Sequence, residues 1–341
     1  MTAYDDLEAR ARSVLPPDVF GYLSGGSGEG RTLAEQERAW AEVRLRPRVL
    51  RDVSVVDTSV SVLGQRLGSP VLVAPSAAHA LCDPDAEVAT ARGARDAGSL
   101  LVLSMRASSR LEDVAATGAF WQQIYVLRDR GISDDVARRA ADAGATALVL
   151  TVDTPVVARK IAGFPSSMPR TGIVAALDDR DPRDERYQQA PDVMPVDIER
   201  LAAVSGLPVV VKGILRGDEA VRAVDSGAAG VLVSTHGGRQ LDGVVPVPYA
   251  LPEVVDAVGD RAEVYADGGV RTGADVLRAL ALGARAALVG RPVLWALATA
   301  GADGVRDLLL ELAADTREAL ALAGCTSCSD VGRDLVDLRT L

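Results

Sequence analysis

Short apolar runs recur along the chain, and most of them are followed by a stretch with helical spacing. Each run is four to six residues long and ends at a polar residue or a glycine. The runs cover residues 70–74, 100–103, 121–126, 147–152, 208–211, 229–233, 262–266 and 286–289. Between them, apolar side chains recur every three or four positions, as in residues 274–282, which end at Gly283 as a helix would. Strands that are apolar throughout and alternate with helices are typical of a parallel sheet covered on both faces.

Eight strand–helix units predict an α/β fold, a closed (β/α)8 barrel of the TIM type. The alternative is an open, doubly wound parallel sheet. Residues 1–65 precede the first strand and are expected to form capping helices and a short hairpin packed on a barrel of residues 66–341. The longest interval between strands includes residues 161–196, which are charged, contain prolines and show little periodicity. An insertion of this length predicts a lid over the barrel mouth.

Composition narrows the class of protein. The apolar share is 48% but the aromatic share only 4%, so the core must consist mainly of Ala, Val and Leu. The net charge of −10 and the lack of a basic run argue against nucleic acid as a partner. All apolar runs are too short to span a membrane. Three cysteines, no metal-ligand constellation and no signal-peptide pattern lead us to expect a cytoplasmic protein without a metal.

Polar residues and glycines follow the predicted strands. In a barrel these positions converge on the carboxyl-terminal face, where active sites lie. Gly268, Gly269 and Arg271 follow the seventh run, and Gly290 and Arg291 follow the eighth. Glycine amides and arginine side chains at these two loops suit a phosphate-bearing ligand. Ordinary glycine turns with surface arginines are the alternative.

The segment 234–242 carries the strongest chemical signal. It holds His236, one of two histidines in the chain, three positions before Arg239. A base that titrates near neutral pH beside a bidentate anion binder suits proton abstraction from a substrate with a clamped carboxylate. Asp153, at the end of another run, could orient His236 and stabilise its protonated form. The alternative is a glycine-rich turn whose polar residues face water.

Lysine usage singles out Lys212. Only Lys160 and Lys212 among the 37 basic residues are lysines, and Lys212 directly follows a buried run. A buried ammonium group needs an anionic partner. That partner is either a ligand that becomes anionic during turnover or a carboxylate in a structural ion pair.

Five motifs together resemble the FMN-dependent α-hydroxy-acid oxidase and dehydrogenase family, which includes glycolate oxidase, lactate oxidase and mandelate dehydrogenase. The resemblance covers residues 15–324, and within the family it is greatest to actinobacterial 4-hydroxymandelate oxidases, notably over residues 290–324. The motifs are Thr-Val-Asp-Thr-Pro (151–155), Val-Lys-Gly-Ile (211–214), Ser-x-His-Gly-Gly-Arg-Gln-Leu-Asp (234–242), Asp-Gly-Gly-Val-Arg (267–271) and Gly-Arg-Pro-Val (290–293).

The resemblance implies FMN as cofactor and oxidation of an α-hydroxy acid to an α-keto acid, with flavin N5 accepting the electrons. Oxygen or another acceptor would reoxidise the flavin, and a homo-oligomer, tetramer or octamer, is expected. His236 would be the base, Asp153 its support, Tyr125 a hydrogen-bond donor to the substrate oxygen, Arg239 the carboxylate clamp and Tyr22 a further substrate contact. The implied FMN contacts are Pro75, Ser76, Ala77, Ser104, Gln123, Thr151, Lys212, Ser234, Asp267, Gly268, Gly269, Arg271, Gly290 and Arg291.

The chain departs from the family on the substrate side. Two adjacent arginines usually follow the first motif, and the second binds the substrate carboxylate. Here the pair is Arg159 and Lys160, both of which we expect to contact substrate. Arg106 follows Met105 where an aromatic side chain often lines the pocket, and it is either an extra anion contact or a solvated loop residue. A specialised hydroxy acid is therefore as plausible as mandelate. A flavin-dependent tailoring oxidase acting on a modified amino acid or peptide is the alternative.

Overall fold

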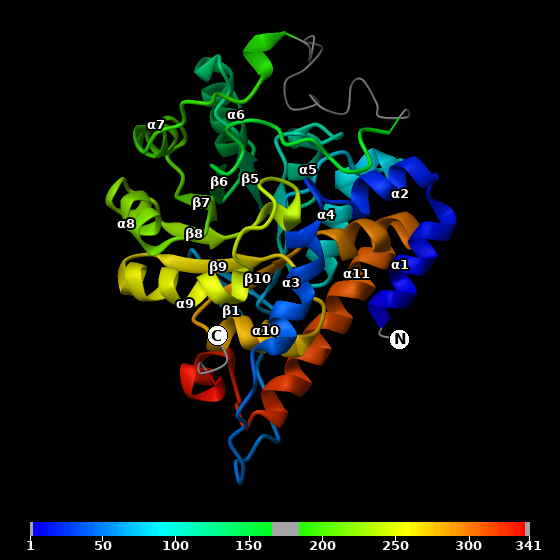
Figure 1. The fold of residues 1–341 in the computed structure, drawn as a ribbon, viewed down its shortest axis with the longest axis vertical. Helices are drawn as coiled ribbons and strands as arrows, with labels where there is room; N and C mark the ends of the chain where they lie inside the picture. The colour runs from blue at the N-terminus through cyan, green and yellow to red at the C-terminus, as the bar shows by residue number, and fades with distance from the viewer. Residues whose placement is uncertain (1–2, 166–183, 338–341) are drawn as a thin grey trace.

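Eight parallel strands form a closed barrel in the computed structural model, which describes residues 3–165 and 184–337. The order around the barrel is β10-β3-β4-β5-β6-β7-β8-β9, so each strand pairs with the strand that follows it in sequence and β10 closes on β3 (Figure 1). This closure confirms the predicted (β/α)8 fold and excludes the open sheet. The strands are β3 (Val71–Val73), β4 (Leu101–Leu103), β5 (Phe120–Ile124), β6 (Ala147–Thr151), β7 (Val209–Ile214), β8 (Gly230–Val233), β9 (Glu263–Asp267) and β10 (Ala286–Val289).

Helices follow the strands and surround the barrel (Figure 1). The capping box of Thr272 and Asp275 shows how a local signal starts one of them, because it satisfies backbone amides of the first turn of α10. The last helix bends at Ala300 and Gly301, where the backbone leaves helical geometry. The helices are α4 (Ala86–Asp96), α5 (Leu111–Ala115), α6 (Arg130–Asp142), α7 (Val196–Ser205), α8 (Gly217–Asp225), α9 (Val247–Val258), α10 (Gly273–Ala281) and α11 (Arg291–Leu322).

The core has two layers, one inside the barrel and one between the strands and the helices. Trp121 and Tyr265 fill the middle of the barrel, with their rings edge to face and 5.5 Å apart. Leu72, Val210 and Leu288 pack around them. The outer layer is built mostly from Ala, Val and Leu. This division explains why a chain with few aromatic residues still has a filled barrel interior.

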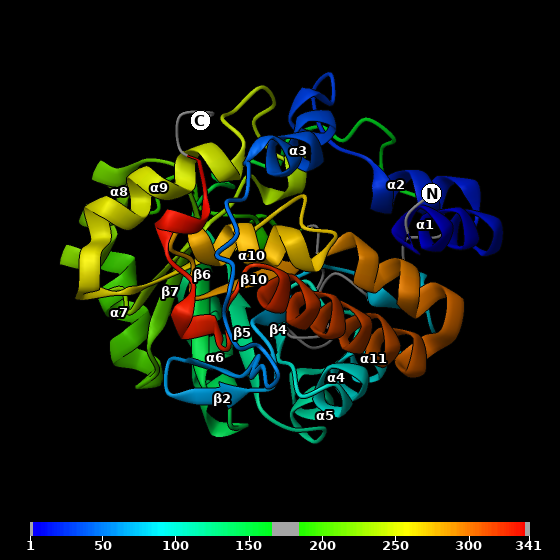
Figure 2. The same cartoon turned by 90° about the horizontal axis from the view of Figure 1, so that it is seen from below.

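The amino-terminal residues close the base of the barrel and flank its mouth. A hairpin of β1 (Val60–Val62) and β2 (Gln65–Leu67) precedes the barrel strands (Figure 2). Its residues Val60, Val62 and Leu67 belong to the apolar cluster inside the barrel. Helices α1 (Ala3–Val14) and α2 (Pro17–Ser24) pack against the start of α11, and α3 (Arg31–Glu42) lies beside the loop after β8. The division of the chain at residue 65 stays a prediction.

Two strand ends differ from the prediction in a way that affects the site. β7 continues to Ile214, so Lys212 lies within the strand and not after it. A bulge at Gly213, whose φ is 108°, allows this extension. β5 ends at Ile124, two residues earlier than predicted, and Tyr125 therefore lies in the loop that follows. The predicted lid falls partly on residues 166–183, which lie outside the described residues.

Candidate active site

A cavity of about 610 Å³ lies at the carboxyl-terminal ends of the barrel strands. Its walls come from the loops after the strands and from α2, so residues far apart in the sequence meet there. Most of the residues predicted for the site line it. They are Tyr22, Pro75, Ser76, Ala77, Ser104, Arg106, Tyr125, Lys160, Lys212, His236, Arg239, Asp267, Gly268, Gly269, Arg271, Gly290 and Arg291.

Other predicted residues do not line the cavity but form hydrogen bonds that support the residues around it. Gln123 donates to the Thr151 hydroxyl at 3.0 Å and accepts from the Met105 amide at 3.0 Å, so it fixes the loop after β4. The Ser234 hydroxyl accepts from the His236 amide at 3.0 Å. Arg159 is exposed and does not line the cavity, whereas the next residue does. The geometry therefore gives no support to Arg159 as a substrate ligand.

His236 and Asp153 form a hydrogen-bonded pair at the cavity wall. The distance from His236 Nδ1 to Asp153 Oδ1 is 2.9 Å. Burial opposes ionisation of Asp153, but the charge and hydrogen bond of His236, and then the charge of Lys212, outweigh it and lower the pKa of Asp153 to about 2. Asp153 is thus a carboxylate at neutral pH. It accepts the Nδ1 proton and leaves Nε2 as the basic nitrogen of the imidazole.

Gly213 makes room for this pair. A Cβ atom at residue 213 would lie 2.6 Å from the Cβ of Asp153, closer than side chains approach one another. Glycine also accepts the positive φ of the β7 bulge without strain. Gly213 in β7 therefore makes space for Asp153, which follows the neighbouring strand β6, as well as allowing the bulge itself.

Tyr125 faces the same part of the cavity. Burial, together with the negative charge of Asp153, raises the pKa of its hydroxyl above the usual range. The hydroxyl therefore stays protonated at neutral pH and can donate a hydrogen bond. Tyr125 and His236 thus bring a fixed donor and a base to one cavity.

Lys212 has a protein carboxylate as its partner. Its ammonium group lies 3.2 Å from Asp267 Oδ2 and donates to the Ser234 hydroxyl at 2.7 Å. Both members of the ion pair are almost fully buried. The sequence left open whether a ligand or a carboxylate would neutralise this lysine, and the structure supplies the carboxylate.

Arginine side chains gather at the ends of β8 and β10. Arg271 pairs with Glu37 at 2.8 Å, whereas Arg239 and Arg291 have no carboxylate partner among the described residues. Arg291 donates to the carbonyl oxygens of Gly25 and Gly237, and Arg239 donates to those of Tyr22 and Gly25. Burial, and then the charges of Arg239 and Arg271, lower the pKa of Arg291 to about 9. An anion bound among these guanidinium groups would relieve their repulsion.

Unpaired buried atoms show where a polar ligand fits. Among the described residues, Asp267 Oδ1 and Arg291 Nε are buried and have no hydrogen-bond partner, although both residues line the cavity. The carboxylate oxygen suits a ligand hydroxyl, and the guanidinium nitrogen suits an anionic oxygen. A ribityl chain that ends in a phosphate carries both kinds of group, so the residues present fit FMN.

Lys160 and Arg239 are adjacent. The Lys160 ammonium group donates to the backbone carbonyl oxygen of Arg239. Partial burial, followed by the charge of Arg239, lowers the pKa of Lys160 to about 8. Lys160 is therefore a cation at neutral pH, but one that loses its charge under mildly alkaline conditions.

Several cavity residues were not predicted from the sequence. Gln240 accepts from the Ala158 amide at 3.0 Å, and the Phe164 ring lies 5.4 Å from that of Tyr22. Residues 187–189 also line the cavity. They lie in the interval predicted as a lid, but nothing in their local pattern distinguishes them from a solvated loop.

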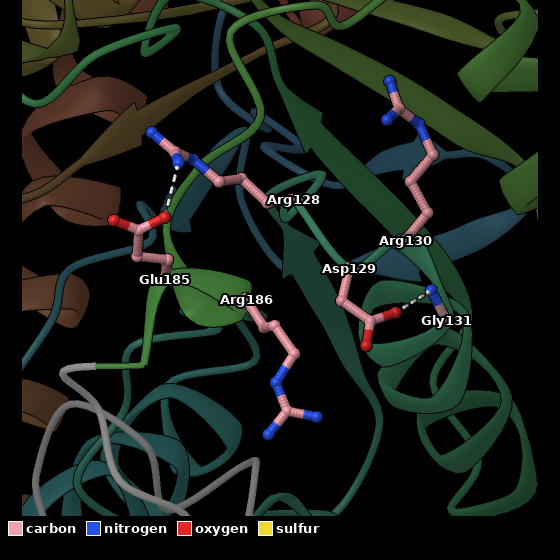
Figure 3. Close-up of a pocket in the computed structure, with 6 residues that line it drawn as sticks. All are labelled: Arg128, Asp129, Arg130, Gly131, Glu185 and Arg186. Atoms are coloured by element: carbon pink, nitrogen blue, oxygen red, sulfur yellow. Dashed lines mark hydrogen bonds and ion pairs between the residues drawn. The ribbon is translucent and has the colours of Figure 1, made fainter.

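A second, open pocket lies outside the barrel mouth, between the start of α6 and residues 185–186 (Figure 3). Its arginines are paired with carboxylates. Arg128 lies 3.2 Å from Glu185, and Arg130 lies 3.1 Å from Asp197. The charges in this pocket therefore neutralise one another, as is usual on a solvated protein surface.

Residues 3–165 and 184–337 contain no group of three or more His, Cys, Asp or Glu side chains placed to hold a metal ion. Over the same ranges, no helix is long and apolar enough to cross a membrane.

Comparison with known proteins places these observations in a family. The sequence model of the FMN-dependent dehydrogenase family matches residues 11–338. The 4-hydroxymandelate oxidase of Amycolatopsis orientalis is 46% identical over 338 residues, which is 94% of each chain. The L-lactate oxidase of Nostoc is 40% identical, over 98% of this chain and 97% of its own. The crystal structure of mandelate oxidase with (S)-4-hydroxymandelic acid superposes with a TM-score of 0.92 at 45% identity, covering 97% of both chains.

The fold, the cavity and the relatives together define a (β/α)8 barrel oxidoreductase with a histidine–aspartate pair and a cluster of arginine side chains at the carboxyl-terminal mouth. The chain belongs to the FMN-dependent dehydrogenase family, and its cofactor is FMN.

Proposed function

We propose that this protein oxidises a 2-hydroxy acid to the 2-oxo acid in an FMN-dependent reaction. The observation that carries this proposal is the His236–Asp153 pair in the same cavity as two cations free to hold a carboxylate, Arg239 and Lys160. The curated relatives act on 2-hydroxy acids, which supports the same assignment. Mandelate and 4-hydroxymandelate are the first substrates to test.

His236 is proposed to take the proton that leaves the substrate. Asp153 holds the ring through Nδ1, so Nε2 is presented as the base, and the carboxylate stabilises the imidazolium that forms. Tyr125 donates a hydrogen bond to the substrate oxygen, because its hydroxyl stays protonated. Tyr22 packs its ring against the Arg239 guanidinium, 4.8 Å away, and limits how that side chain can move.

The substrate carboxylate is proposed to bind Arg239 and Lys160. Arg239 offers a planar fork of donors, and Lys160 adds a point charge beside it. This arrangement fixes the α-carbon near His236 and Tyr125, so the hydroxyl faces the base.

FMN is proposed to lie against the loops after β3 and β4, with its phosphate near Arg271 and Arg291. Ser76, Ala77 and Ser104 line that side of the cavity, with Gln123 and Thr151 supporting the wall behind them. Lys212 and Asp267 face the cavity from β7 and β9. When bound, FMN supplies the two-electron oxidant that accepts the reducing equivalents of the substrate. A later acceptor, oxygen or another molecule, completes the cycle.

Anaerobic reduction of the bound flavin tests the proposal. We expect at least one of glycolate, lactate, mandelate and 4-hydroxymandelate to bleach the visible absorbance of the purified protein. His236→Ala should retain bound FMN but reduce it about a hundredfold to ten-thousandfold more slowly, as expected for removal of a general base. If no hydroxy acid bleaches the wild-type flavin, the substrate belongs to another class and the proposal fails.

Two expectations from the sequence stay predictions. One is the homo-oligomer, for which exposed apolar side chains at Val49, Leu50 and Val55 offer a contact surface. Light scattering after gel filtration would give its mass. The other is the cytoplasmic location.

A further inference from the structure

Arg106 is a partly buried cation in the substrate part of the cavity. It follows β4, lines the cavity, and its guanidinium carbon lies 5.9 Å from the centre of the Tyr125 ring. Its backbone is fixed, because its amide donates to the Ser104 hydroxyl and its carbonyl accepts from the Ala78 amide. The side chain is therefore a defined part of the wall beside a proposed catalytic residue.

The protein partners of Arg106 are neutral. Its Nη2 donates to the Tyr187 carbonyl oxygen and to Gln189 Oε1, each at 3.2 Å. Within the described ranges no carboxylate pairs with it, and neither Nε nor Nη1 donates to a protein atom. Burial lowers its pKa, as expected for a cation removed from water without an opposite charge. Neutral acceptors satisfy two donors but leave the charge uncompensated.

Tyr187 and Gln189, which contact Arg106, belong to the segment of residues 184–190. Unlike Arg106, the arginines on the outer side of this segment pair with carboxylates. Arg128 pairs with Glu185 (Figure 3), and Arg186 pairs with Asp184. Backbone bonds from Arg128 to the Gln188 carbonyl and from Ala190 to the Val126 carbonyl hold this segment against the loop after β5. Its position is thus set without Arg106. The segment supplies carboxylates outside the cavity and only neutral oxygens inside it.

The other cavity cations already have anions assigned to them. Glu37 and the FMN phosphate account for Arg271, the same phosphate accounts for Arg291, and the substrate α-carboxylate accounts for Arg239 and Lys160. Arg106 is the one cation among the described cavity residues to which no anion has been assigned. We propose that Arg106 binds a second carboxylate, carried on the side chain of the substrate, so that the preferred substrates are 2-hydroxy acids with an acidic side chain. This inference rests on the proposed function and narrows its substrate class.

Matched substrate pairs test the inference. The first pair is 2-hydroxyglutarate and 2-hydroxypentanoate, and the second is 4-carboxymandelate and 4-methylmandelate. We expect the wild-type enzyme to favour the dicarboxylate in at least one pair by about tenfold or more in kcat/KM, since a charge-assisted hydrogen bond contributes about that factor. Arg106→Gln should lower kcat/KM for that dicarboxylate about tenfold to a hundredfold, and change the monocarboxylate by less than about threefold.

Controls separate the subsite from folding and from the reaction. Arg128→Gln removes an arginine paired outside the cavity and should leave the preference unchanged. Arg106→Lys keeps a charge and should retain part of the preference, with bound FMN and the unfolding temperature measured for every variant. Binding of 2-oxoglutarate and 2-oxopentanoate, followed by the flavin absorbance spectrum, gives a readout that needs no turnover.

The outcomes are distinct. Equal kcat/KM within both pairs, or an equal loss for both members in Arg106→Gln, overturns the second carboxylate site. If no hydroxy acid reduces the flavin but 2-oxoglutarate binds more tightly than 2-oxopentanoate and only while Arg106 is present, the proposed function fails and the subsite stands. If neither reduction nor preferential binding is seen, both fail.

Discussion

Lys160 shows how one side chain can set the pH range of substrate binding. It is half-buried beside Arg239, and both burial and the neighbouring charge favour its neutral form, giving a pKa of about 8. An arginine in the same place would keep its charge, because the guanidinium group is far more basic. With lysine and not arginine at this position, we expect substrate binding to be sensitive to alkaline pH.

We predict that kcat/KM falls as pH rises above about 8. The protonated form of Lys160 attracts the substrate carboxylate, so affinity is full below this pKa and is lost above it, at up to about tenfold per pH unit. Lys160→Arg should remove this fall in kcat/KM at alkaline pH. Steady-state rates of both enzymes between neutral and alkaline pH would check this, and an identical fall in Lys160→Arg would assign it to another group.

Gly213 offers a second test at the residue scale. Gly213→Ala combines a positive φ of 108° with a Cβ that meets Asp153, so we expect Asp153 to be displaced from His236. Activity should fall at least about tenfold, in line with the loss of an oriented base. The strained backbone should also cost about 1–3 kcal/mol of stability.

Gly227→Ala is the matched control for this change. Gly227 also has a positive φ, of 89°, but a Cβ there meets no atom within 4 Å. The control should lose stability and keep its activity, as measured by urea unfolding and flavin reduction. Equal activity in the two variants would show that the contact with Asp153 does not matter.

At the scale of elements, the two ends of the barrel have different tasks. The loops after the strands build the cavity, while the β1–β2 hairpin packs apolar side chains into the base. Val62 is fully buried in that cluster, and the adjacent Ser61 is exposed. Changes at the hairpin should therefore affect stability without affecting chemistry.

The Val62→Ala substitution tests whether the base of the barrel affects stability without affecting catalysis. Removing two buried methyl groups should lower the free energy of unfolding by about 1–3 kcal/mol, while kcat at moderate temperature stays near that of the wild type. Ser61→Ala should change neither quantity. A large drop in kcat for folded, FMN-loaded Val62→Ala would mean that the hairpin also controls the mouth.

How much the sequence predicts also differs between elements. The eight strands follow from local apolar runs, and His236, Arg239 and Lys212 follow from their position after or near those runs. The ion pair of Lys212 with Asp267 does not, because it depends on which strands lie close together. Residues 187–189 were missed for a related reason, since tertiary backbone bonds place them and no periodic pattern marks them. Arg159 and Lys160 look equivalent in sequence, but only Lys160 lines the cavity.

At the scale of the whole molecule, a chain with a net charge of −10 gathers several arginine side chains at one end of its barrel. Arg271 pairs with Glu37, but burial and the charges of Arg239 and Arg271 disfavour the charged form of Arg291, so we expect a bound anion to stabilise the folded state. Cofactor binding and stability should therefore be strongly linked.

We predict that removal of FMN lowers the unfolding temperature and that added FMN restores it. Free FMN at a hundred times its dissociation constant should add about 2.7 kcal/mol to the free energy of unfolding. Riboflavin, which lacks the phosphate, should add less at the same concentration. Equal thermal shifts for FMN and riboflavin would argue against a phosphate site at the arginine cluster.

The close approach of Gly213 to Asp153 also limits how this barrel can evolve. Gly213 lies in β7 and Asp153 lies just after the neighbouring strand β6, and a side chain at 213 would occupy the space of the Asp153 Cβ. A substitution at one of these positions therefore constrains which residue the other can carry. Among related barrels, we expect a residue larger than glycine at this point of β7 only where the position of Asp153 after β6 has changed as well. A mutant library that randomises one position alone would sample mostly inactive proteins, whereas one that varies both together could reach new chemistry.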